Sequence, residues 1–127
     1  MQMVLIWNTC WWLLLVLWTI GLLRPEPIQM QHELISPALS WVTAKGLHLG
    51  VYALLAFFAS NLPGTYSNKL ICYVILVAHA FATEFFQQWV KERTGSITDV
   101  GINLTGIVLG LGLITIKRFF MPGLRDG

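Results

Sequence analysis

Four long apolar runs constrain the fold of this chain more than any other feature of its sequence. They cover approximately residues 4–23, 44–60, 70–90 and 97–120. A helix needs about 20 apolar residues, within a range of roughly 17 to 25, to cross the hydrocarbon core of a bilayer, and each run meets this requirement. We therefore expect an all-α integral membrane protein. It would be a bundle of four transmembrane helices in antiparallel up-and-down order, forming a single domain over residues 1–127.

The low content of charged residues supports the membrane assignment. Charged residues make up 11% of the chain and apolar residues 56%, whereas soluble domains carry about 25% charged residues. A soluble chain of 127 residues would need more charged side chains to cover its surface. The net charge of +2 is too small to indicate a nucleic-acid partner, and no basic run with interleaved aromatic residues supports one.

The first apolar run is N-terminal and could instead be a signal peptide. No Lys or Arg precedes it, and the sequence LLRPEP that follows it contains no cleavage site made of small residues. We expect this run to be retained as a helix, which Pro25 and Pro27 end because proline lacks a backbone N–H. Gly95 is expected to end the third helix, and Ser96 or Thr98 to cap the fourth.

Polar residues are concentrated between the last two apolar runs, in the sequence TEFFQQWVKERTGSITDVGIN. This segment of residues 83–103 holds five of the fourteen charged residues of the chain. Three sets of residues have the spacing of one helix face: Glu84, Gln87, Gln88 and Lys91; Lys45, His48 and Tyr52; Asp99, Asn103 and Gly106. In an antiparallel bundle the second helix begins, the third ends and the fourth begins on the same side. We therefore expect one pocket lined by Lys45, His48, Glu84, Gln87 or Gln88, Arg93, Asp99 and Asn103.

Glu84 is the most costly member of this set to bury. A charged residue near the centre of a membrane helix costs about 2.5–3.5 kcal/mol on insertion scales, so the carboxylate needs a partner. Lys45, His48 and Arg93 are the candidates. Ionisable groups inside a membrane usually line a ligand or ion path, which favours a functional pocket. The alternative is a purely structural cluster of ion pairs and hydrogen bonds.

Lysine and arginine residues are divided evenly between the two sides of the predicted bundle. On the side of the N-terminus lie Lys69, Lys117, Arg118 and Arg125, and on the opposite side lie Arg24, Lys45, Lys91 and Arg93. Without Lys45 and Arg93, which belong to the predicted pocket, the count is four against two. Since positive loops favour the cytoplasmic side, we expect both termini in the cytoplasm and the pocket facing outward.

Other residues are expected to serve packing. Gly106 and Gly110 have the small-xxx-small spacing that lets membrane helices approach closely, and Gly112 lies nearby. His79 falls off the polar stripe and is expected to be a hydrogen-bonded core histidine. Cys10 and Cys72 are expected to be buried free thiols, because they lack the spacing of metal ligands.

The six tryptophans are expected to act mainly as anchors at the membrane interfaces. Near one surface we place Trp7, Trp11 and Trp12, near the other Trp41 and Trp89, and deeper in the membrane Trp18. A ligand groove lined by tryptophan is the alternative interpretation.

The segments KGLHLGVYALLAF and EFFQQWVKERTGSITDVGINLTGIVLG resemble the VanZ-like membrane proteins. The family pattern has Lys-x-x-His at a helix start, Glu-x-x-Gln, an Arg, Ser-x-x-Asp and Asn-x-x-Gly. The matching residues are Lys45 and His48, Glu84 and Gln87, Arg93, Ser96 and Asp99, and Asn103 and Gly106. The resemblance covers about residues 45–110. An Asp or a similar residue often precedes the Lys in this family, whereas this chain has Ala44.

The resemblance implies a protein of the bacterial cytoplasmic membrane with a role in the cell envelope. The family takes its name from a protein linked to low-level resistance to the glycopeptide teicoplanin. This link does not imply that the present chain confers resistance.

Three hypotheses for the function remain open. In the first, the pocket binds or modifies an anionic amphiphile such as a lipoglycopeptide or a lipid-linked wall precursor, with Lys45, His48 and Arg93 facing the anion. In the second, the protein is an enzyme in which His48 and Glu84 are the general base and acid. In the third, it is an accessory subunit, and the polar cluster only stabilises the bundle.

No cofactor or metal is expected, because only one histidine belongs to the predicted pocket. Membrane lipids are the expected partners. An ion path through so small a chain would require an oligomer or a larger membrane assembly.

Overall fold

The computed structural model describes residues 2–25, 36–91 and 93–120. Four helices make up the described chain: α1 (Gln2–Leu23), α3 (Pro37–Asn61), α4 (Tyr66–Gln87) and α5 (Ile97–Phe120). The described residues contain no strand, and each helix is long and apolar enough to cross a membrane. The predicted all-α architecture of four membrane-spanning helices is therefore confirmed.

Two helices begin earlier than the apolar runs indicate, because polar residues cap them. The Ser36 hydroxyl accepts a hydrogen bond from the N–H of Leu39, so α3 begins before the expected residue 44. The Thr65 hydroxyl accepts one from the N–H of Asn68 at the start of α4. Such caps satisfy N–H groups that the first turn of a helix leaves without partners. The bounds of α5 agree with the expected range.

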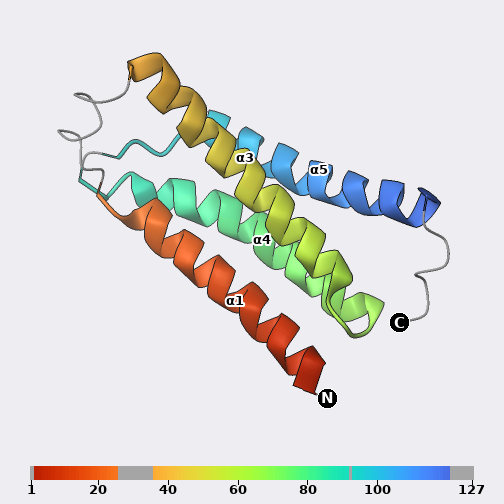
Figure 1. The fold of residues 1–127 in the computed structure, drawn as a ribbon. Coiled ribbons are helices and arrows are strands. Elements are labelled where there is room, and N and C mark those ends of the chain that lie inside the picture. The colour runs from red at the N-terminus through yellow and green to blue at the C-terminus, as the bar shows by residue number, and fades with distance from the viewer. Residues whose placement is uncertain (1, 26–35, 92, 121–127) are drawn as a thin grey trace.

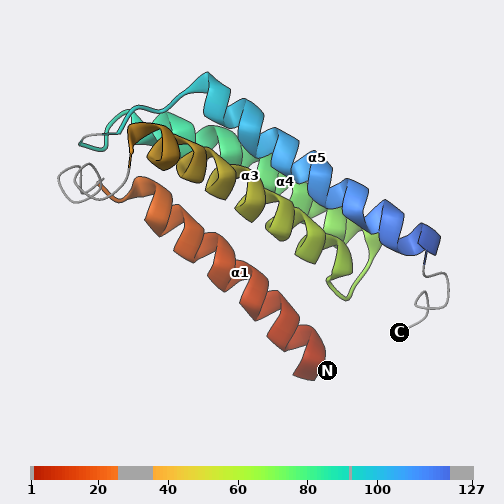
Figure 2. The same ribbon diagram turned by 45° about the horizontal axis from the view of Figure 1, so that its top comes forward.

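Successive helices run in opposite directions (Figures 1 and 2). The C-terminal ends of α1 and α4 and the N-terminal ends of α3 and α5 consequently lie at the same end of the bundle, which we call the polar end. The opposite end carries the turn between α3 and α4, in which Gly64 has a positive φ of 135°. The antiparallel order therefore brings together the helix ends that carry the polar stripes.

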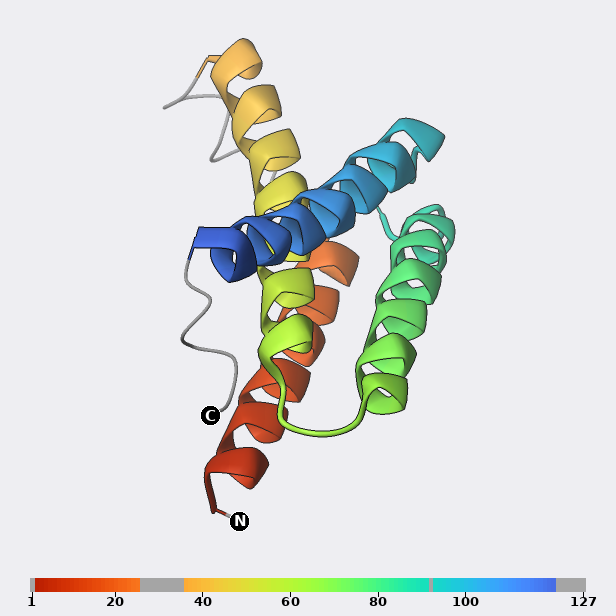
Figure 3. The ribbon, with the colours of Figure 1, turned by 90° about the vertical axis from the view of Figure 1, so that its right-hand side faces the viewer.

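Helix α5 crosses α3 steeply, as Figure 3 shows. A Cβ atom on Gly106 would lie 2.4 Å from the carbonyl oxygen of Leu49, and one on Gly110 would lie 2.3 Å from that of Ala53. Only glycine therefore permits this backbone contact, as predicted. Gly112 has no atom within 4 Å of the corresponding position, so it does not take part in this crossing.

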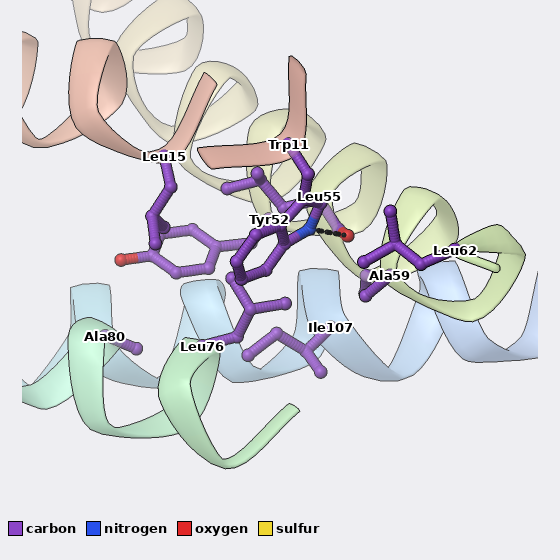
Figure 4. Packing of buried hydrophobic residues seen from close by; sticks show 10 residues of the cluster. Trp11, Leu15, Tyr52, Leu55, Ala59, Leu62, Leu76, Ala80 and Ile107 are labelled. Carbon is purple, nitrogen blue, oxygen red and sulfur yellow. Dashed lines mark hydrogen bonds between the residues drawn. The ribbon is translucent and has the colours of Figure 1, made fainter. Parts of the chain in front are cut away.

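Trp11 lies in the apolar core, contrary to the expectation that it anchors the chain at a membrane surface. Its side chain is 1% exposed, and its indole N–H donates a hydrogen bond of 3.0 Å to the carbonyl oxygen of Leu55 (Figure 4). Leu15, Tyr52 and Leu76 complete this part of the core. The other large apolar side chains are mostly exposed on the outside of the bundle, as a lipid environment allows.

Candidate functional site at the polar end

The segment between α4 and α5 folds back against the last turn of α4. A Cβ atom on Gly95 would lie 1.8 Å from the backbone oxygen of Glu84, so no other residue fits at this position without displacing the backbone. The expectation that Gly95 ends α4 is wrong, because that helix already ends at Gln87. Gly95 instead permits close contact between the connecting segment and α4.

This contact positions Ser96 over the Glu84 side chain. The backbone N–H of Ser96 donates a hydrogen bond of 3.1 Å to Glu84 Oε2. The Ser96 hydroxyl accepts a bond of 3.2 Å from the N–H of Thr98, and its carbonyl oxygen accepts one of 2.9 Å from the N–H of Asp99. Ser96, rather than Thr98, is therefore the residue that caps the start of α5.

The second oxygen of Glu84 contacts α3 and α5. Glu84 is 3% exposed, and its Oε1 lies 3.4 Å from Asn103 Nδ2 and 3.7 Å from His48 Nδ1. His48 is 7% exposed and Asn103 is fully buried. Of the three candidate partners for Glu84, the structure thus gives His48 this role. We call His48, Glu84 and Asn103 the polar-end network.

The hydrogen bonds of this network determine which nitrogen of His48 carries a proton. Asn103 donates through Nδ2 to the Glu84 carboxylate, so its Oδ1 faces His48 Nδ1 at 2.9 Å. The opposite amide orientation would place an oxygen against the carboxylate and is disfavoured. Because Asn103 Oδ1 and Glu84 Oε1 are both acceptors, Nδ1 of His48 must carry the hydrogen. A carboxylate and an amide thus jointly orient the imidazole ring.

Lys45 and Asp99 form an ion pair above this network. Lys45 Nζ contacts Asp99 Oδ1, and their side chains are 24% and 10% exposed. The Lys45 ammonium group also lies 5.9 Å from the centre of the Trp41 ring. Each residue is near a member of the network on its own helix, since His48 follows Lys45 by three positions and Asn103 follows Asp99 by four. Lys45 is therefore the cation at the outer edge of the buried cluster.

Gln87 and Arg93 reach toward α1. Gln87 Nε2 donates a hydrogen bond of 3.0 Å to the carbonyl oxygen of Leu22. Arg93 donates to the carbonyl oxygens of Arg24, at 3.2 Å, and Gly21, at 3.5 Å. These carbonyls belong to the end of α1, where a helix leaves its last oxygens without internal partners and favours cations. Both side chains thus attach α1 to the polar end.

Gln88 and Lys91, the other residues of the predicted stripe on the third helix, lie beyond the end of α4. Both are exposed, in the turns that follow Gln87. The predicted face therefore stops at Gln87, which is 3% exposed. Of the two glutamines that the spacing allowed, Gln87 is the one that enters the site.

The sequence predicted no site residue on α1, yet this helix contacts the network. The Trp18 ring packs edge-on against the His48 ring, with centres 5.7 Å apart and planes at 76°. The sequence places Trp18 deeper than the neighbouring tryptophans but does not indicate a contact with His48. Its contact with His48 depends on the rotation of α1 about its own axis, which only packing determines.

A second group of polar side chains lies deeper in the bundle, and we call Thr19, Tyr52, His79 and Thr83 the middle network. His79 Nε2 lies 2.8 Å from the Thr19 hydroxyl, and Nδ1 lies 2.8 Å from the Tyr52 hydroxyl. The Tyr52 hydroxyl also lies 3.4 Å from that of Thr83. The expectation of a hydrogen-bonded core histidine is confirmed for His79. The sequence already placed Tyr52 on one face with Lys45 and His48, and Thr83 could have been anticipated because it precedes Glu84 on α4.

The structure thus brings His48, Glu84 and Asn103 into direct contact and places Lys45 with Asp99 beside them. Arg93 and Gln87 lie at the same end and hold α1. Within the described ranges, no three His, Cys, Asp or Glu side chains lie close enough to hold a metal ion. The described side chains at the polar end form hydrogen bonds and ion pairs, and His48 and Glu84 are groups that can transfer protons.

A comparison with protein families identifies the relationship of this chain. The model of the VanZ/LLP1 family matches residues 9–118. The chain belongs to the VanZ/LLP1 family. The match includes the polar-end network and residues 9–23 of α1, a helix whose sequence showed no feature of the family. Comparisons with curated proteins and with solved structures gave no match. The protein is thus a VanZ/LLP1 membrane protein with four helices able to cross the bilayer.

Proposed function

We propose that this VanZ/LLP1 protein binds the headgroup of an anionic amphiphile at the polar end. The observation that carries the proposal is a buried network, made of groups from three helices, below two partly exposed cations. Lys45 is paired with Asp99 at its outer edge, and Arg93 lies on the connecting segment against α1. Lysine provides a point charge and arginine a planar pair of donors, and both suit a phosphate or carboxylate.

The proposed setting is the cytoplasmic membrane of a bacterium, with both termini in the cytoplasm and the polar end facing outward. The contacts of Lys45 and Arg93 support leaving them out of the charge count, because both cations have partners within the protein. A lipid-linked wall precursor or a lipoglycopeptide would reach an outward site. The link of the family to teicoplanin suits such a ligand class.

The test compares binding of anionic phosphatidylglycerol and zwitterionic phosphatidylcholine to the full chain, measured by native mass spectrometry. We expect the wild type to prefer phosphatidylglycerol and Arg93→Gln to reduce this preference about tenfold, as expected for one charged hydrogen bond. Lys45→Met is combined with Asp99→Asn, so that no buried carboxylate loses its partner, and should act similarly. If both variants bind phosphatidylglycerol as strongly as the wild type, the proposal is wrong.

Lys117→Gln provides the matched control at the opposite end of the bundle. Lys117 is exposed and its ammonium group lies 3.4 Å from Asn61 Oδ1, so the variant changes the net charge without touching the polar end. Its preference for phosphatidylglycerol should equal that of the wild type. A comparable loss in this variant would mean that the lipids respond only to total charge.

A structural role is the second candidate function. It is favoured because groups of the protein itself contact the Glu84 carboxylate. Both carboxylate oxygens contact groups outside α4, on α3, on α5 and on the segment before α5. Under this hypothesis Glu84→Ala lowers stability and expression, whereas Glu84→Gln leaves lipid binding and any cellular phenotype intact. Loss of lipid preference in a folded Glu84→Gln protein would argue against a purely structural cluster.

A further inference from the structure

Two ring nitrogens beside the polar-end network lack hydrogen-bond partners. Among the described residues, none forms a hydrogen bond of normal geometry with His48 Nε2 or with the buried Trp18 Nε1, although the Tyr52 hydroxyl lies close to the Trp18 indole. A buried N–H without an acceptor destabilises the folded state, so a native protein rarely leaves one without water or a ligand. The buried Trp18 N–H therefore indicates a place where another polar group binds, and the free nitrogen of His48 lies on the ring that Trp18 contacts.

The hydrogen bonds of His48 determine what its free nitrogen can do. Since Nδ1 carries the hydrogen that faces Asn103 and Glu84, Nε2 of the neutral ring bears a lone pair and accepts hydrogen bonds. Asn103 and Glu84 are positioning residues here, because they fix the tautomer without facing the free nitrogen. This use of a second nitrogen to hold an imidazole in one tautomer is common at functional histidines.

Trp18 supplies the complementary group. Its indole N–H can only donate, and its ring contacts the His48 ring at a centre-to-centre distance of 5.7 Å. One acceptor and one donor therefore lie on two rings in contact, contributed by α3 and α1. A hydroxyl group matches this pair, because it donates one hydrogen bond and accepts another.

We propose that a hydroxyl group of the bound amphiphile occupies this place, donating to His48 Nε2 and accepting from Trp18 Nε1. The inference rests on the proposed function and deepens it, because it specifies a headgroup with both a negative charge and a hydroxyl. The cations at the polar end bind the charge, and the histidine–tryptophan pair binds the hydroxyl. Helix α1, which showed no polar stripe in its sequence, then contributes directly to ligand recognition.

The Tyr52 hydroxyl is a competing acceptor, since it also lies close to the Trp18 indole. If Trp18 donates to Tyr52 in the membrane, the indole N–H is not available to a ligand. Tyr52→Phe removes this competitor and leaves the ring in place. Under the proposal, the variant retains the preference for a hydroxylated headgroup.

The experiment compares phosphatidylglycerol with phosphatidylethanol, whose headgroup has the same charge but no hydroxyl, with phosphatidylcholine as the reference. Binding to the full chain is again measured by native mass spectrometry. We expect the wild type to prefer phosphatidylglycerol over phosphatidylethanol by roughly three- to tenfold, as one or two hydrogen bonds would give. Trp18→Phe, which keeps an aromatic ring against His48 but lacks the N–H, should lose most of this preference.

The outcomes separate the two proposals. Equal binding of both anionic lipids, each stronger than phosphatidylcholine, would overturn the hydroxyl site and leave the anion site standing. No preference for either anionic lipid over phosphatidylcholine would overturn both. A preference for phosphatidylglycerol that survives in Trp18→Phe, or one that disappears in Tyr52→Phe, would contradict the role given to the Trp18 N–H.

If Trp18→Phe folds poorly, a spectroscopic measurement on the wild-type protein tests the proposal instead. In the wild-type protein labelled with ¹⁵N-tryptophan, phosphatidylglycerol should shift the Trp18 indole resonance and phosphatidylethanol should leave it in place. Identical shifts with the two lipids would overturn the proposal without any substitution.

Discussion

The polar-end network and the middle network are both built around an imidazole held between helices, yet they differ in composition. His79 has hydroxyl partners on both nitrogens, from Thr19 on α1 and Tyr52 on α3. His48 has a carboxylate and an amide near one nitrogen, and no described residue pairs with the other. The middle network is therefore neutral, and we call it closed because both nitrogens of its histidine have partners. The polar-end network contains a carboxylate, and we call it open because His48 Nε2 has no partner among the described residues.

The two networks differ in the hydrogen-bonding capacity that they leave available. The Thr19 hydroxyl donates to the carbonyl oxygen of Leu15 at 2.7 Å, so it accepts from Nε2–H of His79. Nδ1 of His79 is then the acceptor for the Tyr52 hydroxyl. Each hydrogen in this chain has one acceptor, so the middle network attaches α1 without offering a place for a ligand. The available hydrogen-bonding capacity lies at the polar end.

The largest expected effect comes from removing the carboxylate of the polar-end network. Glu84→Ala leaves the N–H groups of Ser96 and Asn103 without their acceptor and removes the carboxylate beside the His48 imidazole, and should destabilise the fold by about 3 kcal/mol. Glu84→Gln keeps an acceptor and should cost less than half as much. Reversible unfolding in mixed micelles measures both values. Equal losses in the two variants would show that the negative charge itself holds the network together.

Gly95→Ala is expected to break the polar-end network while leaving the middle network unchanged. A methyl group 1.8 Å from the Glu84 carbonyl oxygen forces the connecting segment away from α4 and lengthens the bond between Ser96 N–H and Glu84. Overpacking of this kind costs about 1–3 kcal/mol. Thermal unfolding in detergent measures the loss, and Gly101→Ala, at an exposed position with no neighbouring atom within 4 Å, is the control.

Thr19→Val should weaken the middle network by a smaller amount. The valine has nearly the same shape but leaves Nε2–H of His79 without an acceptor, which costs about 1 kcal/mol for a hydrogen bond between membrane helices. The lipid preference should not change, because the polar-end network is untouched. A variant that unfolds normally but loses the preference for anionic lipid would mean that the two networks are coupled.

The smallest effect is a difference between two histidine spectra. In protein labelled with ¹⁵N-histidine, His48 should show a protonated Nδ1 and His79 a protonated Nε2, because their hydrogen-bond partners require opposite tautomers. Adding phosphatidylglycerol should shift only the Nε2 resonance of His48. The same tautomer at both residues would refute the distinction between an open and a closed network.

The sequence determined which helices exist and which of their ends carry polar chemistry. Runs of about 20 apolar residues require membrane helices, because a spanning backbone must satisfy its own hydrogen bonds. Antiparallel order then places the start of α3, the end of α4 and the start of α5 together. The convergence of His48, Glu84 and Asn103 follows from these two facts and from helical spacing alone.

Only the tertiary structure shows which side chains at the polar end pair with one another. The sequence offered Lys45, His48 and Arg93 to Glu84, and the structure joins Lys45 to Asp99 and Arg93 to carbonyl oxygens of α1. These pairings depend on the rotation of each helix and on the steep crossing of α3 and α5, which the contacts at Gly106 and Gly110 make possible. The spacing of polar residues indicates which face of a helix turns inward, but it does not fix these rotations, because they result from packing between segments that are far apart in the chain. For the same reason, the contact of Trp18 with His48 could not be predicted from the sequence of α1.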